Sequence, residues 1–566
     1  MLKKTIINPM LTYLDIKQYN WADLAPQYTR LAEQPLTPDN VSAWLADWRS
    51  VYDIASELFS RAYVNRTLDT TNAEYNERYT DLIENFWPQI VENETALKKK
   101  LLESGLTPPG LEVPMRDIRG DAALFRAENL PLHTEEEKLV MQYDKIIGTQ
   151  SVEWQGETKT LIQLEAELQN TDRTHREKAW RAIMERKQAD RTALNELWGE
   201  LLNLRQKIAH NAGLPSFREY AWHQKHRWDY SPADCKQFQQ AIAEVVVPVA
   251  SQIYAQRKAK LGVSELRPWD LEVDASGLPA MRPFADDQEL IARASNVFRQ
   301  LDGDLSGEYE TMRREQLLDL ANRPGKAPGG YCIGFPLTSK PFIFMNAIGT
   351  SDNVRTLLHE AGHAFHAFAA VRLPYHSQQE IPMEFCEVAS MSMELLSLPY
   401  LGKEQGGYFD SADAKRYLQE QLSDIVLFWP YMAVVDSFQH WVYENPQVAH
   451  SANACDDTWS ALWQKFMPGV DWSGLEEHRA TGWHRKLHIF RYPFYYVEYG
   501  LARLGAVQIW ANSLKDPGKA LEQYRHALSL GGTSTLPQLF AKAGGKLGFD
   551  TATMQAAMQV VQDQLA

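Results

Sequence analysis

Cysteine is scarce in this chain of 566 residues, and no two cysteines form a CxxC pair. The four cysteines are far apart in the sequence, at positions Cys235, Cys332, Cys386 and Cys455. This distribution excludes a zinc knuckle built from paired cysteines and gives no sign of a disulfide framework. Since such a sequence fits a reducing compartment, we expect a cytoplasmic protein.

Positive charge is also in deficit. The chain has 58 Lys and Arg against 73 Asp and Glu, which gives a formal net charge of −15. An acidic chain repels nucleic acids and anionic membranes unless its basic residues are concentrated locally, and the sequence shows no such concentration. We therefore expect no nucleic-acid partner and no membrane partner.

Long apolar runs, low-complexity tracts and phosphate-binding GxxxxGK loops are missing as well. Near the N-terminus the apolar run is interrupted at Asn8, Pro9 and Asp15, too early for a secretion signal or a membrane span. We therefore expect the mature chain to be the whole chain. Its 44% hydrophobic and 23% charged residues are typical of a soluble globular protein with a large core.

The pattern along the chain predicts a mostly α-helical protein of several domains, at roughly 150 residues per domain. Apolar residues recur at helical spacing over residues 39–102 and 134–259. Short strands are predicted at Pro341–Asn346 and in a hairpin over Ser151–Leu161 that turns at Gly156. Segments rich in Pro and Gly predict loops or linkers at residues 107–114, 267–283 and 323–341.

The motif that carries chemistry is HEAGH at residues 359–363, in a helix that Thr350, Ser351 or Asp352 can cap. On a helix His359 and His363 lie one turn apart on the same face, so both imidazoles can reach one metal ion. Glu360 projects from a neighbouring direction, where it can contact a water molecule rather than the metal. The opposite face is expected to be buried and carries Leu358, Ala361, Phe365 and Phe368.

A simpler interpretation is an amphipathic helix whose histidines only line a polar face. His366 also lies on the ligand face, but it is about 10 Å along the helix axis from His359. That distance favours a supporting or packing role for His366 over metal ligation.

A catalytic zinc ion needs a third protein ligand, and the next predicted helix, over residues 378–396, offers three acids. Glu384, Glu387 and Glu394 lie on one side of this helix, so any of them could bind the metal. A solvated acidic stripe is the alternative. Glu387 has small apolar neighbours, and an acid in such surroundings needs a partner such as a cation.

An aromatic segment at residues 483–505 forms a third group of candidates. Tyr496 and Tyr499 are three residues apart, so on a helix they could present two hydroxyl groups to one point. Hydrolysis of an amide through an oxyanion requires such neutral donors. An aromatic helix in the core is the alternative. The same segment also contains His484, His488, Tyr492 and Tyr495.

Together these residues resemble the oligoendopeptidase F group of the thimet oligopeptidase family, which are zinc metallopeptidases. The resemblance covers most of the chain and is carried by LRPWDLEV (266–273), PFIFMNAIGTSDNVRTLLHEAGHAFH (341–366), EFCEVASM (384–391) and HIFRYPFYYVEYG (488–500). A weaker likeness extends over LSLGGTSTLPQLFAKAG (528–544).

The resemblance implies a role for each site residue. One Zn²⁺ ion would be held by His359, His363 and Glu387, with Glu360 as general base. His488, Tyr496 and Tyr499 would stabilise the transition state, and Gly330, Tyr331 and Tyr492 would bind the substrate. It also implies a two-lobed helical zincin with a deep substrate channel and a small β-sheet next to the active-site helix. In that fold the GGYC loop (329–332) and the strand at 341–346, as an edge strand, would receive the peptide backbone.

We therefore expect a cytoplasmic zinc endopeptidase for short unstructured peptides, with an N-terminal helical region at 1–200 and a catalytic region at 201–566. One alternative is a zinc carboxypeptidase or dipeptidase, which needs a charged clamp for one end of the substrate. Another is a peptide-binding protein with a structural zinc ion. The sequence leaves the oligomeric state open.

Overall fold

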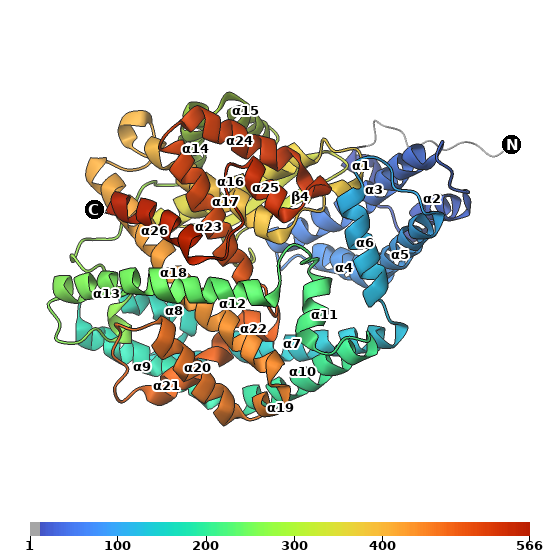
Figure 1. Ribbon diagram of the computed structural model, residues 1–566. Coiled ribbons are helices and arrows are strands. Elements are labelled where there is room, and N and C mark those ends of the chain that lie inside the picture. Colours follow the sequence, from blue (N-terminus) through green and yellow to red (C-terminus); the bar gives the residue numbers. More distant parts are fainter. Residues whose placement is uncertain (1–11, 566) are drawn as a thin grey trace. The chain divides into compact units, whose positions relative to one another are not determined.

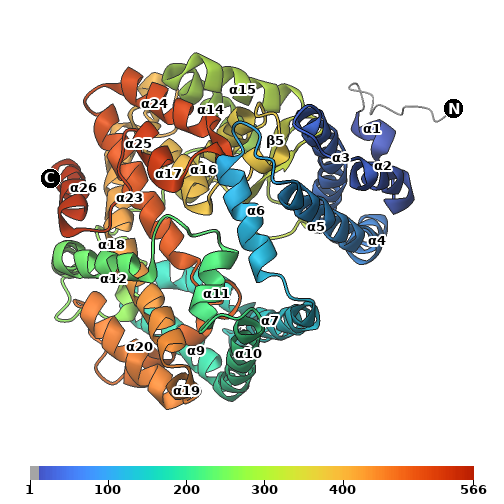
Figure 2. The same ribbon diagram turned by 45° about the vertical axis from the view of Figure 1, so that its right-hand side comes forward.

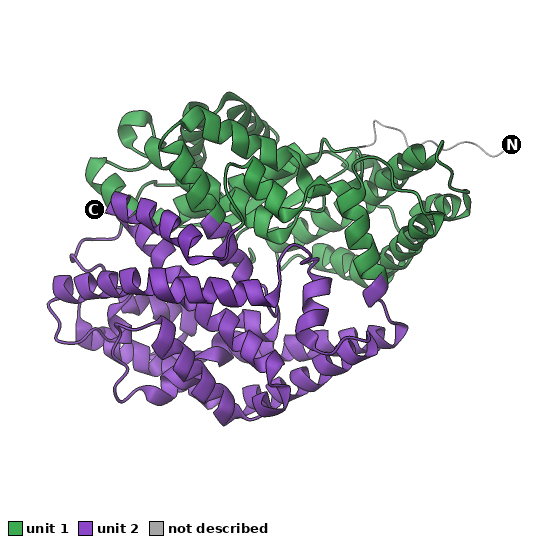
Figure 3. Cartoon of the chain, in the orientation of Figure 1, with its two compact units in different colours: residues 1–122, 281–418, 505–547 green, residues 123–280, 419–504, 548–566 purple. Residues whose placement is uncertain are grey.

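The computed structural model describes residues 12–565, which are mostly helical (Figure 1), as expected. The chain divides into two compact units (Figure 3). Unit 1 contains the residues up to 122 together with 281–418 and 505–547, and unit 2 contains 123–280, 419–504 and the residues from 548 onwards. The interrupted apolar run that argued against a secretion signal lies mostly outside the described residues.

The described residues of unit 1 contain eleven complete α-helices and a three-stranded sheet. Its helices are α1 (Tyr13–Ile16), α2 (Trp21–Glu33), α3 (Val41–Leu68), α4 (Ala73–Asp81), α5 (Trp87–Ser104), α14 (Asp287–Leu301), α15 (Gly303–Arg314), α16 (Ser351–Ala370), α17 (Met383–Leu396), α24 (Pro517–Ser529) and α25 (Leu536–Lys542). Three further helices begin in one unit and end in the other: α6 (Glu112–Leu124), α18 (Ser411–Glu444) and α23 (Tyr496–Ser513).

In the part of unit 2 that the structure describes, one hairpin accompanies helices and their connecting loops. Its complete helices are α7 (Leu130–Gly148), α8 (Leu161–Glu165), α9 (Arg173–Ala189), α10 (Arg191–Asn211), α11 (Phe217–Gln224), α12 (Pro232–Ala241), α13 (Val247–Leu261), α19 (Pro446–Ala449), α20 (Ala452–Phe466), α21 (Glu476–Ala480), α22 (Leu487–Phe490) and α26 (Thr551–Leu565). The hairpin of β1 (Ser151–Trp154) and β2 (Glu157–Thr160) confirms the predicted turn, where Gly156 has a φ of +87°.

The sheet of unit 1 has the strand order β3–β5–β4. Strand β5 (Lys340–Ala347) confirms the strand predicted at 341–346, and it pairs in parallel with β3 (Leu318–Ala321) and antiparallel with β4 (Tyr331–Phe335). Two expectations were wrong. The segment 323–341 is not only loop, because it contains β4, and the strand at 341–346 is central, so β4 is an edge strand instead.

Helices α16 and α17 lie side by side in unit 1 (Figures 1 and 2). Thr350 caps α16, because its side chain accepts the backbone N–H of Asn353. At Gly362 the helices are so close that a Cβ atom would lie 2.6 Å from the Cα of Ser390 and 2.7 Å from the carbonyl oxygen of Ala389. A glycine at this position therefore permits the close approach of the two helices.

Two long helical rods contain a π-helical turn just before a proline. Helices α12 and α13 are joined by the π turn Ile242–Val246, so the two helices form one continuous rod (Figure 1). The helix continues directly after the turn with Val247 and Pro248. The π turn Leu82–Phe86 precedes Pro88 in the same way. Proline has no N–H to donate within a helix, so a local change in hydrogen bonding lets each rod continue.

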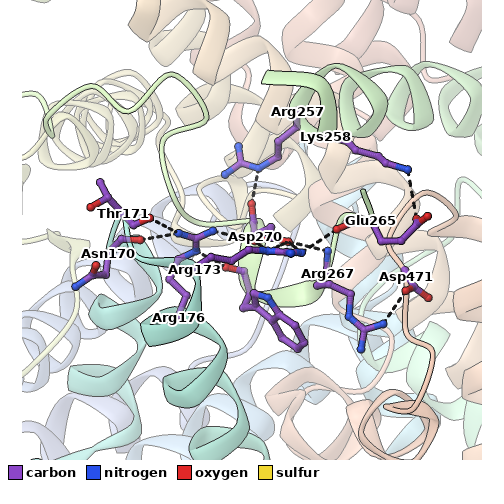
Figure 4. Close-up of polar contacts among 11 residues, drawn as sticks. Asn170, Thr171, Arg173, Arg176, Arg257, Lys258, Glu265, Arg267, Asp270 and Asp471 are labelled. Atoms are coloured by element: carbon purple, nitrogen blue, oxygen red, sulfur yellow. Dashed lines mark hydrogen bonds and ion pairs between the residues drawn. The ribbon is translucent and has the colours of Figure 1, made fainter. Parts of the chain in front are cut away.

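The LRPWDLEV stretch is anchored in unit 2 by a buried carboxylate (Figure 4). Asp270 is fully buried and accepts hydrogen bonds from Arg173, from Arg176 and from the backbone N–H of Arg267. Burial alone would raise the pKa of Asp270, but these donors outweigh it and lower the pKa. This part of the family resemblance therefore has a structural role.

The described residues contain no helix with the length and apolar character needed to cross a bilayer.

Candidate metal centre

Three side chains of types that can bind a metal converge where α16 packs against α17. His359 and His363 come from α16, and Glu387 comes from α17. The Oε2 atom of Glu387 is 3.4 Å from Nε2 of His359 and 3.8 Å from Nε2 of His363. The three donor atoms all lie within 4.8 Å of one another, so one ion could contact all of them.

The carboxylate of Glu387 is fixed by its own helix. Its side chain is 9% exposed, and Ser390, one turn further along α17, donates its hydroxyl to Oε2 at 3.1 Å. Hydrogen bonds of this kind orient a carboxylate toward a metal.

Glu394 lies on the other side of the His359 ring. Its Oε1 is 2.7 Å from Nδ1 of His359, while Nε2 of that ring is the atom near Glu387. A carboxylate behind a histidine fixes the tautomer and the ring orientation. Of the three acids considered from the sequence, the structure brings only Glu387 into the donor cluster of the described residues, whereas Glu384 is buried outside it.

The electrostatics of the cluster favour a positive charge. Burial lowers the pKa of His363 to about 4, so this ring is neutral at neutral pH, the form that binds a metal. Burial would also lower the pKa of His359, but the hydrogen bonds with Glu387 and Glu394 outweigh it and raise the pKa to about 10. The two carboxylates thus favour a positive charge at this point, either a proton on His359 or a bound cation.

Glu360 is 7% exposed, and its carboxylate lies near β4, where the backbone N–H of Cys332 acts to lower its pKa. Burial raises the pKa of Glu360 to about 7, although the neighbouring His359 opposes the shift. It is not one of the three clustered donors, so it can exchange protons beside them.

The donor set fits Zn²⁺. Two imidazoles and one carboxylate form a common ligand set of catalytic zinc sites, and such sites leave one position open. Here the supporting groups are also in place, since Glu394 and Ser390 hydrogen-bond to His359 and Glu387. The residues that would hold the ion are His359, His363 and Glu387.

The remaining faces of α16 follow the sequence pattern. Leu358, Ala361 and Phe365 are fully buried as expected, whereas Phe368 is only half-buried. His366 is 3% exposed, lies outside the donor cluster and packs edge-on against Phe385.

The predicted substrate-binding residues lie in different environments. Gly330 precedes β4, and Tyr331 begins it. The side chain of Tyr331 is held by its neighbours. Its hydroxyl forms a hydrogen bond with the hydroxyl of Thr67 at 2.5 Å, and its ring stacks on Phe344 with centroids 4.8 Å apart. Tyr492, in unit 2, is 43% exposed.

The other predicted catalytic residues form an aromatic cluster in unit 2. The ring centroids of His488 and Tyr496 are 4.8 Å apart, those of His488 and Tyr499 are 5.9 Å apart, and the two tyrosines are 5.8 Å apart. Burial lowers the pKa of His488 to about 4 and raises that of Tyr496. At neutral pH the cluster therefore has an uncharged imidazole and a protonated phenol.

The sequence analysis did not assign three groups at these sites. Glu394 was considered only as a ligand. The N–H of Cys332 was not considered, because spacing along a helix says nothing about a backbone group on a distant strand. Lys486 was also missed. Its Nζ lies 3.8 Å from the ring centroid of Tyr496, and burial lowers its pKa to about 7. Its place within the aromatic segment was the available signal.

Comparisons with known proteins give a consistent result. Residues 166–559 match the sequence profile of Peptidase family M3. The chain is 23% identical over 334 residues to an oligoendopeptidase F homolog of Lactococcus lactis subsp. lactis, covering 56% of this chain and 52% of the relative. It is 24% identical over 300 residues to an oligoendopeptidase F homolog of Borreliella burgdorferi, covering 51% of this chain and 48% of the relative. These alignments span about half the length of the curated relatives.

The fold agrees over nearly the whole chain. A solved structure of PZ peptidase A with an inhibitor matches with a TM-score of 0.85 and 26% identity, covering 97% of this chain and 99% of that one. Oligoendopeptidase F from Enterococcus faecium matches with a TM-score of 0.63 and 17% identity over 96% of both chains, a likeness of fold alone. The expected resemblance to oligoendopeptidase F is confirmed, and the chain belongs to Peptidase family M3.

Proposed function

We propose that this chain is a cytoplasmic zinc endopeptidase that hydrolyses internal bonds of short unstructured peptides. The observation that carries the proposal is the convergence of His359, His363 and Glu387, with Glu360 directly after His359 in the sequence. A bound Zn²⁺ would supply Lewis-acid chemistry, polarising a carbonyl and acidifying water.

In this proposal Glu360 acts as the general base and then as the general acid. It takes a proton from the attacking water and passes it to the nitrogen of the leaving amine. Its place near the backbone N–H of Cys332 supports the assignment, because the carboxylate then lies next to the edge strand β4.

Strand β4 suggests how a peptide binds. It is an edge strand, and an extended peptide can add to such an edge through main-chain hydrogen bonds. A peptide on β4 would run past Cys332 and therefore close to Glu360. In this proposal the segment at Gly330 and Tyr331 contributes backbone groups, since the Tyr331 hydroxyl is bonded to Thr67.

In this proposal the developing oxyanion accepts hydrogen bonds from three neutral side chains, those of His488, Tyr496 and Tyr499. Tyr492 contacts the substrate. The family resemblance suggests these roles, and the clustering of the three donor side chains supports them. Donors that are uncharged at neutral pH stabilise negative charge that forms only in the transition state.

The first test is Glu360→Gln. We expect the variant to keep its zinc, measured by elemental analysis, and to lose cleavage of an internally quenched peptide, because glutamine cannot move the proton. Glu310→Gln, at a half-exposed ion pair on α15, is the control and should behave as wild type. Turnover near the wild-type rate in Glu360→Gln would overturn the mechanism.

Product mapping by mass spectrometry, with and without a chelator, tests the type of cleavage. Internal cuts that stop on chelation support the endopeptidase, whereas removal of one or two terminal residues supports the carboxypeptidase or dipeptidase. Tight binding without products supports the peptide-binding alternative.

Cell fractionation tests the proposed cytoplasmic location. All four cysteines are free thiols, which supports this location. Recovery of the protein outside the cytoplasm would contradict it.

A second variant, Tyr499→Phe, tests the donor role. Removing one oxyanion donor typically lowers kcat by about 10²–10³-fold, and we expect this loss with little change in KM. Tyr220→Phe is a matched control in unit 2, where the hydroxyl bonds His133. A change in KM alone would reassign Tyr499 to substrate binding.

A further inference from the structure

A second group of side chains of types that can bind a metal lies in unit 2. Cys235 comes from α12, and Asp436 and His440 come from α18, one helical turn apart. Their donor atoms lie within 4.8 Å of one another, and all three residues are at most 2% exposed. In the described residues, the only other cluster of this kind is the one at His359.

The charge of Asp436 is poorly compensated within the protein. Its Oδ2 accepts the side-chain amide of Gln239 at 2.6 Å and lies 3.5 Å from Nε2 of His440, but its Oδ1 has no hydrogen-bond partner. Within residues 12–565 no lysine or arginine forms an ion pair with Asp436. A fully buried carboxylate is costly unless a cation or several donors balance it.

His440 has the same deficit. Neither ring nitrogen has a hydrogen-bond partner, although buried imidazoles normally have at least one. Aromatic rings surround the imidazole, with the centroid of Trp222 at 5.6 Å and that of Phe494 at 5.3 Å. An ion bound at Asp436 and His440 would satisfy both unpartnered groups.

We propose that Cys235, Asp436 and His440 bind a second divalent ion, Zn²⁺, as a structural site. A thiolate together with an imidazole favours zinc over magnesium or calcium. The thiolate and the carboxylate would neutralise the two charges of the ion, as a dry site requires. Gln239, one turn after Cys235, holds the carboxylate through its amide.

Such a site would clamp α12 to α18. The ion would tie the N-terminal half of the α12–α13 rod to the C-terminal half of α18, within unit 2. The proposal does not depend on the proposed peptidase function, because none of its ligands belongs to the centre at His359.

Metal stoichiometry tests the proposal without changing unit 2. In a His359→Ala/His363→Ala variant, equilibrated with zinc and passed through gel filtration, we expect one zinc ion per chain, compared with two in wild type. Absence of zinc from this variant would overturn the proposal and leave Asp436 and His440 as a metal-free ion pair. Equal zinc content in the two proteins would instead count against the centre at His359.

Variants of the cluster identify the ligands. Added to the same background, Cys235→Ser or His440→Gln should lose the remaining ion, whereas Cys455→Ser should keep it. Cys455 is a matched control, since it is another buried cysteine of unit 2 and its thiol bonds the carbonyl of Ala449. Retention of the ion in both Cys235→Ser and His440→Gln would overturn the assignment.

Cobalt provides an independent readout. Co²⁺ bound in the His359→Ala/His363→Ala variant should show the near-ultraviolet charge-transfer band of a cobalt–thiolate bond. The band should disappear in Cys235→Ser and persist in Cys455→Ser. A cobalt-loaded protein without this band would rule out Cys235 as a ligand.

Discussion

At His359 the two ring nitrogens have different carboxylate partners. This difference distinguishes the acid that could bind the metal from the acid that orients the ring. The sequence could place His359 and His363 on one helical face because local spacing determines that face. Spacing alone could not choose among Glu384, Glu387 and Glu394, which share a side of one helix, and only the family resemblance selected Glu387. The choice depends on how α17 packs against α16, which brings Glu387 to Nε2 and Glu394 to Nδ1.

Glu394 is therefore a positioning residue, and we expect Glu394→Ala to weaken zinc binding about 10- to 100-fold. Without the carboxylate, the His359 ring loses the group that orients it. Competition with a chromophoric chelator measures the affinity.

The conservative variant Glu394→Gln should restore much of the affinity, because an amide oxygen still accepts from Nδ1. Glu310→Ala, on the exposed surface of α15, should bind zinc as wild type does. If Glu394→Ala binds zinc with unchanged affinity, Glu394 does not position the ligand.

At the scale of elements, the sequence predicted what short-range patterns encode. The β-branched and aromatic run of β5 and the Gly156 turn were both visible. Strand β4 was hidden by the Pro- and Gly-rich composition around it, and the central place of β5 depends on partners on both sides. Pairing between strands is a tertiary property, so composition could not reveal which strand is at the edge.

The contact of α16 with α17 gives an element-scale prediction. In Gly362→Ala the new methyl group would meet the backbone of Ser390 and Ala389, which cannot rotate away as a flexible side chain would. We expect the helices to separate, with a loss of about 1–3 kcal/mol in the free energy of unfolding. Glu387 would move with α17, so zinc content should fall as well.

Gly307→Ala is the matched control on α15, because Gly307 is exposed and a methyl group added there would have no neighbouring atom within 4 Å. This substitution should stabilise the protein by about 0.4–1 kcal/mol through the unfolded state. Denaturant unfolding and elemental analysis compare the two variants. A Gly362→Ala protein with wild-type stability and full zinc content would show that the close approach is not required.

At the scale of the whole molecule, each compact unit is assembled from three separate stretches of chain. Only the boundary at 280/281 falls in a Pro- and Gly-rich segment that the sequence marked as a linker. Three others fall inside α6, α18 and α23, where continuous helices give no sign of a boundary. The expected division between an N-terminal helical region and a catalytic region, at residue 200, lies within α10. That division of roles stays a prediction.

This arrangement predicts that residues 201–566 do not fold by themselves. The missing segment would take with it Glu57, which accepts the backbone N–H of Thr338 in unit 1. The cut would also remove Arg173 and Arg176, which both donate to the buried carboxylate of Asp270. Removing even one partner of a buried ion pair typically lowers the free energy of unfolding by about 3–5 kcal/mol. We expect the fragment to lack a cooperative thermal transition and to retain no zinc after gel filtration.

Co-expression of residues 1–200 should restore both properties if the two pieces find each other. The control is a chain cut at the hairpin turn between Gln155 and Gly156, with both pieces present, because an exposed loop tip tolerates a cut. This nicked protein should unfold cooperatively and keep its zinc, since every contact of Glu57 and Asp270 survives. A monodisperse 201–566 fragment that unfolds cooperatively would show that the N-terminal segment is an accessory to an independent folding unit.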